Sequence, residues 1–150
     1  MKNQLIILGL SIGLLACGSD DGPSAIDCSG EVCQATIASG ETAVTVPSEI
    51  HGTFEMEYTY AENNSPIDLG TKATFAIAAN SLIVSVDGEE CYTIENAVER
   101  TSGSGNYIFK AECKADYAFN ISQNTDGSLS EINLVPANGP GFYGQFTLVQ

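Results

Sequence analysis

The regular alternation of apolar and polar residues constrains the fold of this chain more than any other feature of its sequence. Within 51–60, an apolar side chain stands at every second position: Phe54, Met56, Tyr58 and Tyr60. When the period is two, alternate side chains lie on opposite faces of an extended strand, whereas a helix has a period near 3.6. Similar stretches follow at 71–79, 82–87, 90–95, 106–113, 116–122, 129–135 and 142–149. We therefore expect an all-β fold with about eight strands.

Turn signals between these stretches predict how the strands pair. Asp126-Gly127 suits a two-residue type I′ hairpin turn, because that turn needs a positive φ at both central residues. A hairpin centred there places Ile121 opposite Ile132. Turns at Asn80-Ser81, Asp87-Gly88 and Lys114-Ala115-Asp116 give registers that bring apolar residues to the same face. Because a one-residue slip would turn a strand over, this agreement favours an antiparallel meander.

The predicted meander becomes an up-and-down β-barrel if its last strand pairs with its first and so removes both edges. A β-sandwich of the same strands is the alternative. The candidate barrel interior consists of Phe54, Met56, Tyr58, Phe75, Ile77, Val84, Phe109, Phe119, Ile121, Leu134, Phe146 and Leu148. A barrel of eight strands is filled by side chains or holds one small ligand. Gly52-Thr53-Phe54 weakly resembles the Gly-x-Trp at the start of lipocalins, which would imply a small carrier of an apolar molecule.

The amino end has the form of a secretory signal. Lys2 precedes the apolar run Leu5–Leu15, which is too short to span a bilayer as a helix. Leu14-Leu15-Ala16-Cys17 resembles the lipobox of bacterial lipoproteins. The resemblance implies that residues 1–16 are removed, that the thiol of Cys17 receives diacylglycerol, and that lipid on Cys17 anchors the chain to a membrane. Ser19-Asp20-Asp21 resembles the acidic signal of some lipoproteins sent to the outer membrane, so we expect an outer-membrane location, on its periplasmic or surface-exposed face.

The region from Cys17 to 48 is rich in small and acidic residues and has no long apolar pattern. It is therefore predicted to be a flexible acidic tether, followed by the folded domain at 49–150. Four cysteines remain after Cys17, and an even number in an oxidising compartment predicts two disulfides. A hairpin centred on Ser102 would place Cys91 opposite Cys113, so we expect a Cys91–Cys113 bridge and a local Cys28–Cys33 ring. Their spacing does not match a zinc site, and no metal is predicted.

The composition and motifs favour binding over catalysis. The formal net charge of −14 excludes a nucleic-acid partner that would need basic phosphate contacts. His51 is the only histidine, no nucleophile elbow or cofactor motif is present, and no cofactor is expected. We therefore expect a non-catalytic domain that binds a protein, a glycan or another envelope partner. The alternatives are the lipocalin-like carrier and a hydrolase that uses surface carboxylates: Glu55, Glu57, Glu89 and Glu90.

Two further features of the predicted surface bear on binding. Apolar side chains gather on the nominal outer face of the middle strands and form a candidate partner patch: Ile83, Tyr92, Ile94 and Ile108. Simple cross-strand packing is the equal alternative.

The loop Asn124–Ser128 partly resembles a calcium-binding loop, but its expected closing acidic ligand falls on Asn133, and a hairpin turn explains Asp126-Gly127.

Overall fold

The structure, a computed structural model, describes residues 26–149 as one curled sheet of 11 strands with a single 3-10 turn, η1 (Ser48–Ile50). The strands are β1 (Val32–Gln34), β2 (Thr42–Ala43), β3 (Gly52–Ala61), β4 (Lys72–Ile77), β5 (Ser81–Val86), β6 (Tyr92–Glu95), β7 (Val98–Glu99), β8 (Asn106–Lys110), β9 (Tyr117–Gln123), β10 (Leu129–Pro136) and β11 (Gly144–Leu148). The predicted all-β, barrel-like fold is confirmed. Over this part of the chain, no helix is long and apolar enough to cross a membrane.

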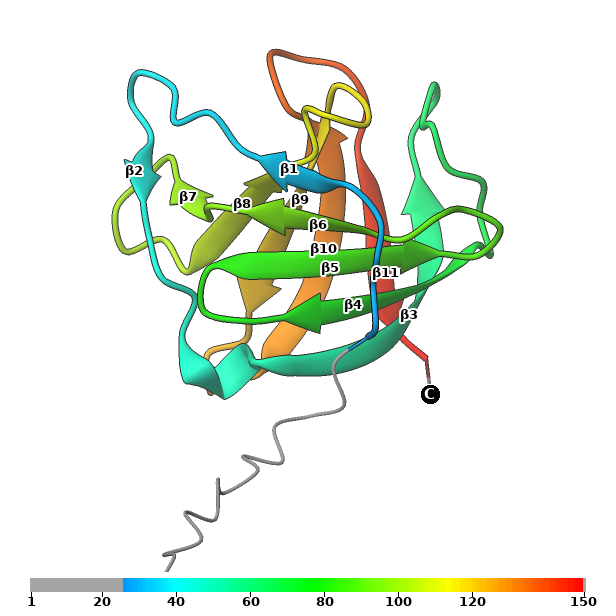
Figure 1. The fold of residues 1–150 in the computed structure, drawn as a ribbon, viewed down its shortest axis with the longest axis horizontal. Coiled ribbons are helices and arrows are strands. Elements are labelled where there is room, and N and C mark those ends of the chain that lie inside the picture. Colours follow the sequence, from blue (N-terminus) through cyan, green and yellow to red (C-terminus); the bar gives the residue numbers. More distant parts are fainter. Residues whose placement is uncertain (1–25, 150) are drawn as a thin grey trace, which may run out of the picture.

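The sheet curls into a half-barrel that stays open along one side. Its order is β1-β6-β5-β4-β3-β11-β10-β9-β8-β7-β2, and the long strand β3 joins the two groups of strands, β4–β6 and β8–β11, that cross in Figure 1. The last strand does pair with the first strand of the meander, because Leu148 lies opposite Met56. The open side lies between β6 and β8, where the hairpin centred on Ser102 was expected to form. The sheet is also mixed, since β1 runs parallel to β6.

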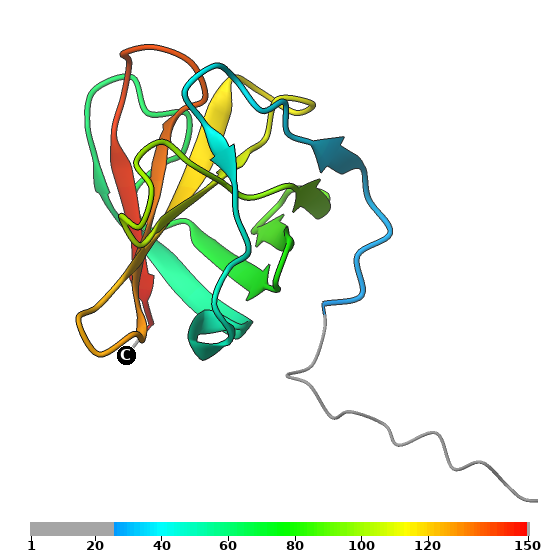
Figure 2. The same cartoon turned by 90° about the vertical axis from the view of Figure 1, so that its left-hand side faces the viewer.

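The eight predicted strands correspond to β3–β6 and β8–β11, whereas β1, β2 and β7 were not predicted. Two of the three unpredicted strands come from the region expected to be a flexible tether. We call residues 26–48 the N-terminal arm. Within it, β1 pairs with β6 and β2 pairs with β7, and Val46 is buried in the main core. For these residues the tether prediction is wrong, because the arm covers the side of the half-barrel that the meander leaves open (Figure 2).

The registers show where the turn predictions succeed. Ile121 lies opposite Ile132, as expected. The β4–β5 and β8–β9 hairpins differ from the expected registers by two residues, so their inner faces are unchanged. The β5–β6 hairpin differs by one residue, because Val84 lies opposite Tyr92 and not Cys91. That slip turns β6 over, so Tyr92 and Ile94 face the core.

The interior of the half-barrel is filled by side chains. Ten of the 12 candidate interior residues are buried, Phe54 is half-buried, and Leu148 is 45% exposed, so its assignment to the interior is wrong. Aromatic rings occupy the centre: the ring centroid of Phe75 lies 5.4 Å from that of Phe119 and 5.1 Å from that of Phe146. Close packing of this kind leaves little space for a ligand between the rings.

Candidate functional site

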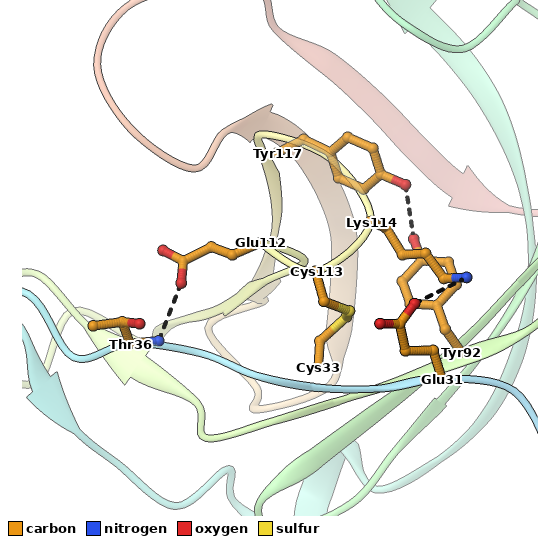
Figure 3. The surroundings of a disulfide bond; sticks show 8 residues. All are labelled: Glu31, Cys33, Thr36, Tyr92, Glu112, Cys113, Lys114 and Tyr117. Carbon is orange, nitrogen blue, oxygen red and sulfur yellow. Dashed lines mark hydrogen bonds and ion pairs between the residues drawn. A yellow bond between two sulfur atoms is a disulfide. The ribbon is translucent and has the colours of Figure 1, made fainter.

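Two disulfides fasten the N-terminal arm across the open side of the half-barrel. They join Cys28 to Cys91 and Cys33 to Cys113, with Cα atoms 5.8 and 5.3 Å apart, so both predicted pairs are wrong. Cys91 immediately precedes β6, and Cys113 lies in the turn between β8 and β9. Because β6 and β8 do not pair, these two cysteines meet partners from the arm that lies between their strands. Figure 3 shows the bridge between Cys33 and Cys113.

Polar contacts reinforce the arm around the disulfides. Glu31 forms an ion pair with Lys114 at 3.5 Å, and the backbone N–H of Thr36 donates to Glu112 at 3.2 Å (Figure 3). Gly30 lies so close to the backbone of Cys91 that an added Cβ would stand 1.7 Å from the carbonyl oxygen. A glycine is therefore required where the arm crosses the start of β6.

A buried ion cluster holds the next part of the arm on the outer face of β8. Lys110, only 1% exposed, lies 2.8 Å from Glu41 and 3.6 Å from Glu112, and its Nζ also donates to the carbonyl of Thr36. Arg100 lies 3.5 Å from the same Glu41 carboxylate. Burial raises the pKa of Glu41, but hydrogen bonds from Lys110 and from the Ala38 N–H, with the charge of Lys110, lower it below its usual value. These charged side chains hold the N-terminal arm against β8.

A hollow of about 290 Å³ opens at the end of the half-barrel beside the disulfides. We call it the mouth hollow; its lining is Pro66, Ile67, Glu89, Glu90, Tyr92, Lys114, Ala115 and Tyr117. The hydroxyls of Tyr92 and Tyr117 hydrogen-bond at 3.0 Å, and Lys114 lies 5.6 Å from the centre of the Tyr92 ring (Figure 3). Burial and the neighbouring phenol raise the pKa of Tyr92, and burial raises that of Tyr117, so both hydroxyls stay protonated at neutral pH.

The structure does not bring the candidate partner patch together. Tyr92 and Ile94 point into the core because β6 is turned over by the one-residue slip. Ile108 is buried on the outer side in a small second cluster with Val98, Ala118 and Ala137. Ile83 alone is partly exposed, in a hollow of about 260 Å³ that also contains His51. The predicted patch is therefore wrong as a surface, and its residues serve packing.

The residues considered for catalysis are dispersed. His51 Nε2 lies 3.0 Å from the carbonyl oxygen of Val46, which ties the ring to the arm. Glu55 and Glu57 belong to β3, while Glu89 and Glu90 lie in the turn before β6. Among residues 26–149 no group of His, Cys, Asp and Glu is arranged to hold a metal ion, and Cys17 lies outside the described residues.

The outer face of β9, β10, β11 and β3 carries a candidate site that was not predicted. We define the tyrosine–amide face as Tyr60, Asn120, Asn133, Tyr143 and Gln145. The register aligns four of them side by side across β9, β10, β11 and β3, since Asn120 faces Asn133, Asn133 faces Gln145, and Gln145 faces Tyr60. A bulge between Gln145 and Phe146 lets Tyr60 face outward although Tyr58 faces the core. The face therefore combines amide groups with an aromatic ring.

Hydrogen bonds fix the polar groups of this face. Tyr143 donates its hydroxyl proton to Asn133 Oδ1 at 2.6 Å, and Asn133 Nδ2 donates to Glu131 at 3.0 Å. Gln145 Nε2 donates to the other oxygen of Glu131. Asn120 Oδ1 is buried and has no hydrogen-bond partner among residues 26–149. Burial, followed by the Glu131 carboxylate, raises the pKa of Tyr143, which keeps its hydroxyl a donor.

Tyr60 and Tyr143 give the face its exposed aromatic edge. Their ring centroids lie 5.9 Å apart at an interplanar angle of 56°, and Tyr60 is 48% exposed. An open hollow of about 560 Å³ adjoins them, lined by Tyr60, Ala61, Glu62, Asn63, Asn64 and Gly141. The sequence did hold a signal for this face: the register predicted from Asp126-Gly127 already places Asn120 opposite Asn133 on the outer side.

Comparisons with known proteins add no relative to this description. No family model matches the sequence, and no curated protein or solved structure matches it.

Proposed function

We propose that this chain is a lipid-anchored lipoprotein of the outer membrane whose β-domain binds an envelope partner without catalysis. The observation that carries the binding function is the tyrosine–amide face, where Tyr60 is held half-exposed beside a fixed network of amides. Aromatic rings with ordered polar neighbours are typical of binding surfaces because little side-chain entropy is lost when they are covered. The lipobox-like Leu14-Leu15-Ala16-Cys17 supports the anchor.

The fastening of the N-terminal arm limits how far the domain stands from the proposed anchor. Cys28 is covalently joined to Cys91, and 11 residue steps separate it from Cys17. Even fully extended, that length spans at most about 40 Å at ~3.3–3.6 Å per residue. The domain would therefore meet partners close to the membrane surface, and not at the end of a stalk of some 30 residues.

Metabolic labelling with a radioactive fatty acid tests the anchor in cells that express the full chain. We expect label in the wild-type protein and none in Cys17→Ser, with Ser11→Ala as a labelled control in the same leader. Label that persists in Cys17→Ser, or its absence from the wild type, would reject the anchor. Capture of envelope components by the full chain, lost in Tyr60→Ala, tests the binding function.

The mouth hollow favours a carrier of a small molecule as a second candidate function. Its volume of about 290 Å³ lies just below the range of ordinary ligand sites, which run from ~300 to 1,000 Å³. A ligand there would contact the Tyr92 and Tyr117 hydroxyls from outside the filled interior. Native mass spectrometry of protein from its own cells tests this candidate, because a carrier should retain a small molecule and should lose it in Tyr117→Ala.

The hydrolase alternative stays a prediction with its own test. Turnover of polysaccharide substrates should disappear when Glu55, Glu57, Glu89 and Glu90 are replaced by glutamine. Equal turnover in that variant and the wild type would end the alternative.

A further inference from the structure

We infer that the tyrosine–amide face binds an oligosaccharide built from neutral or amino sugars. This inference rests on the proposed binding function and names its ligand class. It starts from the chemistry of the face, which combines an exposed phenol ring, amide side chains and carboxylates. A sugar ring has an apolar face of C–H groups and an edge of hydroxyls, so it matches a surface that offers both an aromatic ring and paired donors and acceptors.

Tyr60 supplies the aromatic part of the site. Its ring projects from the outer face of β3 and keeps 48% of its surface exposed, while Tyr143 supports it from one side at 5.9 Å. The ring is held by a strand and by a neighbouring ring, so a sugar stacked on it would order few side-chain torsions. Leu69 is 62% exposed but lies in the loop between β3 and β4, outside the tyrosine–amide face, and serves below as a control.

The amides supply the polar part of the site. Gln145 is half-buried directly opposite Tyr60, and its side chain is oriented by its bond to Glu131. Asn133 is only 5% exposed and is bound at both ends by Tyr143 and Glu131, so it holds the network in place beneath the surface. Amides and carboxylates in a fixed arrangement can accept and donate to the vicinal hydroxyls of a sugar with little rearrangement. The register places Gln145 directly beside Tyr60, where the edge of a stacked sugar would lie.

The charge of the site selects among sugars. The tyrosine–amide face contains no lysine or arginine, and Glu131 and Glu62 lie beside it. Of the basic side chains in the described residues, Arg100, Lys110 and Lys114 are paired with carboxylates elsewhere. Uronic acids, sulfated sugars and phosphorylated sugars would therefore be repelled, whereas neutral sugars would be accepted and protonated amino sugars attracted.

The space beside the ring suits more than one sugar unit. The open hollow of about 560 Å³ runs from Tyr60 past Glu62, Asn63 and Asn64. Asn64 has a positive φ of 67°, a conformation that asparagine adopts more readily than most residues, and this shapes the loop that forms the wall. The open form of the hollow favours a segment of a longer chain over an enclosed monosaccharide.

The test is a binding measurement on the full chain in detergent, with immobilised tetrasaccharides as probes. The probes are neutral hexoses, N-acetylhexosamines, hexosamines and uronic acids. We expect binding to at least one of the first three classes and none to uronic acids. Tyr60→Ala and Gln145→Ala should each weaken that binding by about tenfold or more, the size of effect expected when one aromatic or polar anchor is lost. Tyr143→Phe, which keeps the ring and removes its bond to Asn133, should weaken it less.

Leu69→Ala is the matched control, because it truncates the most exposed large apolar side chain of the described residues and should leave sugar binding unchanged. Unchanged thermal melting of each variant shows that the fold is intact. Three results would overturn the inference: no probe bound, equal binding by Tyr60→Ala, or a preference for uronic acids. If the chain is lipidated at Cys17 and captures a protein through Tyr60 but binds no sugar, the proposed function stands and only the saccharide inference fails.

Discussion

The disulfide connectivity makes a quantitative prediction about stability that depends on how the two bridges are linked. Taken alone, Cys28–Cys91 and Cys33–Cys113 close loops with separations of 63 and 80 residues. Once one bridge is present, however, the shortest path that the second closes runs through the first. That path covers the five steps from Cys28 to Cys33 and the 22 steps from Cys91 to Cys113, or about 27 residues.

The chain-entropy model converts these loops into free energies of unfolding. A first bridge of this length contributes about 4.4 kcal/mol, and the second contributes about 3.5 kcal/mol because its effective loop is shorter. Removing either bridge should therefore cost about 3.5 kcal/mol, and removing both should cost about 8 kcal/mol. The loss of stability on removing both bridges is therefore larger than the sum of the two single losses by about 1 kcal/mol. A native stability of ~5–15 kcal/mol makes the loss of both severe.

Urea unfolding of alanine variants measures these losses. With a slope of ~1–3 kcal/mol/M, the single-bridge variants Cys28→Ala/Cys91→Ala and Cys33→Ala/Cys113→Ala should lower the midpoint by about 1.2–3.5 M. The sharpest variant is Cys28→Ala/Cys33→Ala, which breaks both bridges. A local Cys28–Cys33 ring would instead cost only about 2 kcal/mol, because a five-residue loop is short. A loss near 2 kcal/mol in that variant would therefore refute the connectivity, and the reduced wild type serves as the control.

Three further outcomes follow from the arm and its contacts. Lys110→Met leaves Glu41 buried without its closest cation and should destabilise the protein by about 3–5 kcal/mol in urea unfolding. Lys72 is exposed, so Lys72→Met should be nearly neutral and serves as the control. Because the folded pKa of Glu41 is lowered, its contribution to stability is present above its unfolded pKa and is lost as the pH falls through the folded pKa. Hydrogen exchange in 36–44 should therefore accelerate in acid. An exchange rate that does not depend on pH, after correction for intrinsic exchange, would contradict this. Gly30→Ala should loosen the arm at Cys91, seen as faster exchange in 28–34, and unchanged protection there would show that the contact is not close.

Much of the fold could be predicted from the sequence because alternation directly reports which side of a strand is buried. All eight long strands and ten of 12 interior residues follow from that signal, whereas the pairing of the first strand with the last was expected because it removes both edges of the meander. The short strands β1, β2 and β7 have two or three residues each, which is too few for a period to show. Their place depends on tertiary contacts such as the buried Cys33 and Val46, so the arm resembled a tether in composition alone.

The tyrosine–amide face was only partly within reach of the sequence. The outward asparagines of β9 and β10 follow from a register that was predicted correctly. Tyr60, in contrast, belongs by alternation to the inner face of β3, together with Met56 and Tyr58. Only the bulge opposite Gln145 moves it to the outside, and nothing in the local sequence marks that irregularity.

The failed disulfide prediction goes with a register slip in the β5–β6 hairpin, which differs in this respect from the β9–β10 hairpin. Both Asp87-Gly88 and Asp126-Gly127 were expected to form type I′ turns, but only the glycines have positive φ, 84° and 88°. Without a positive φ at the aspartate, neither turn is type I′, and each hairpin starts one residue out of the expected register. In the second hairpin a bulge between Leu129 and Glu131 restores the register, so Ile121 still meets Ile132.

No bulge corrects the first hairpin, so β6 remains turned over. Tyr92 and Ile94 therefore enter the core, and Cys91 is left at the edge of the open side, away from the position expected opposite Cys113. With β6 turned over and unpaired to β8, the arm supplies both the missing strand and the cysteines that fasten it. The uncorrected one-residue slip of the β5–β6 hairpin thus accompanies the difference between the expected closed meander with a free tether and the observed half-barrel completed by its own N-terminal arm.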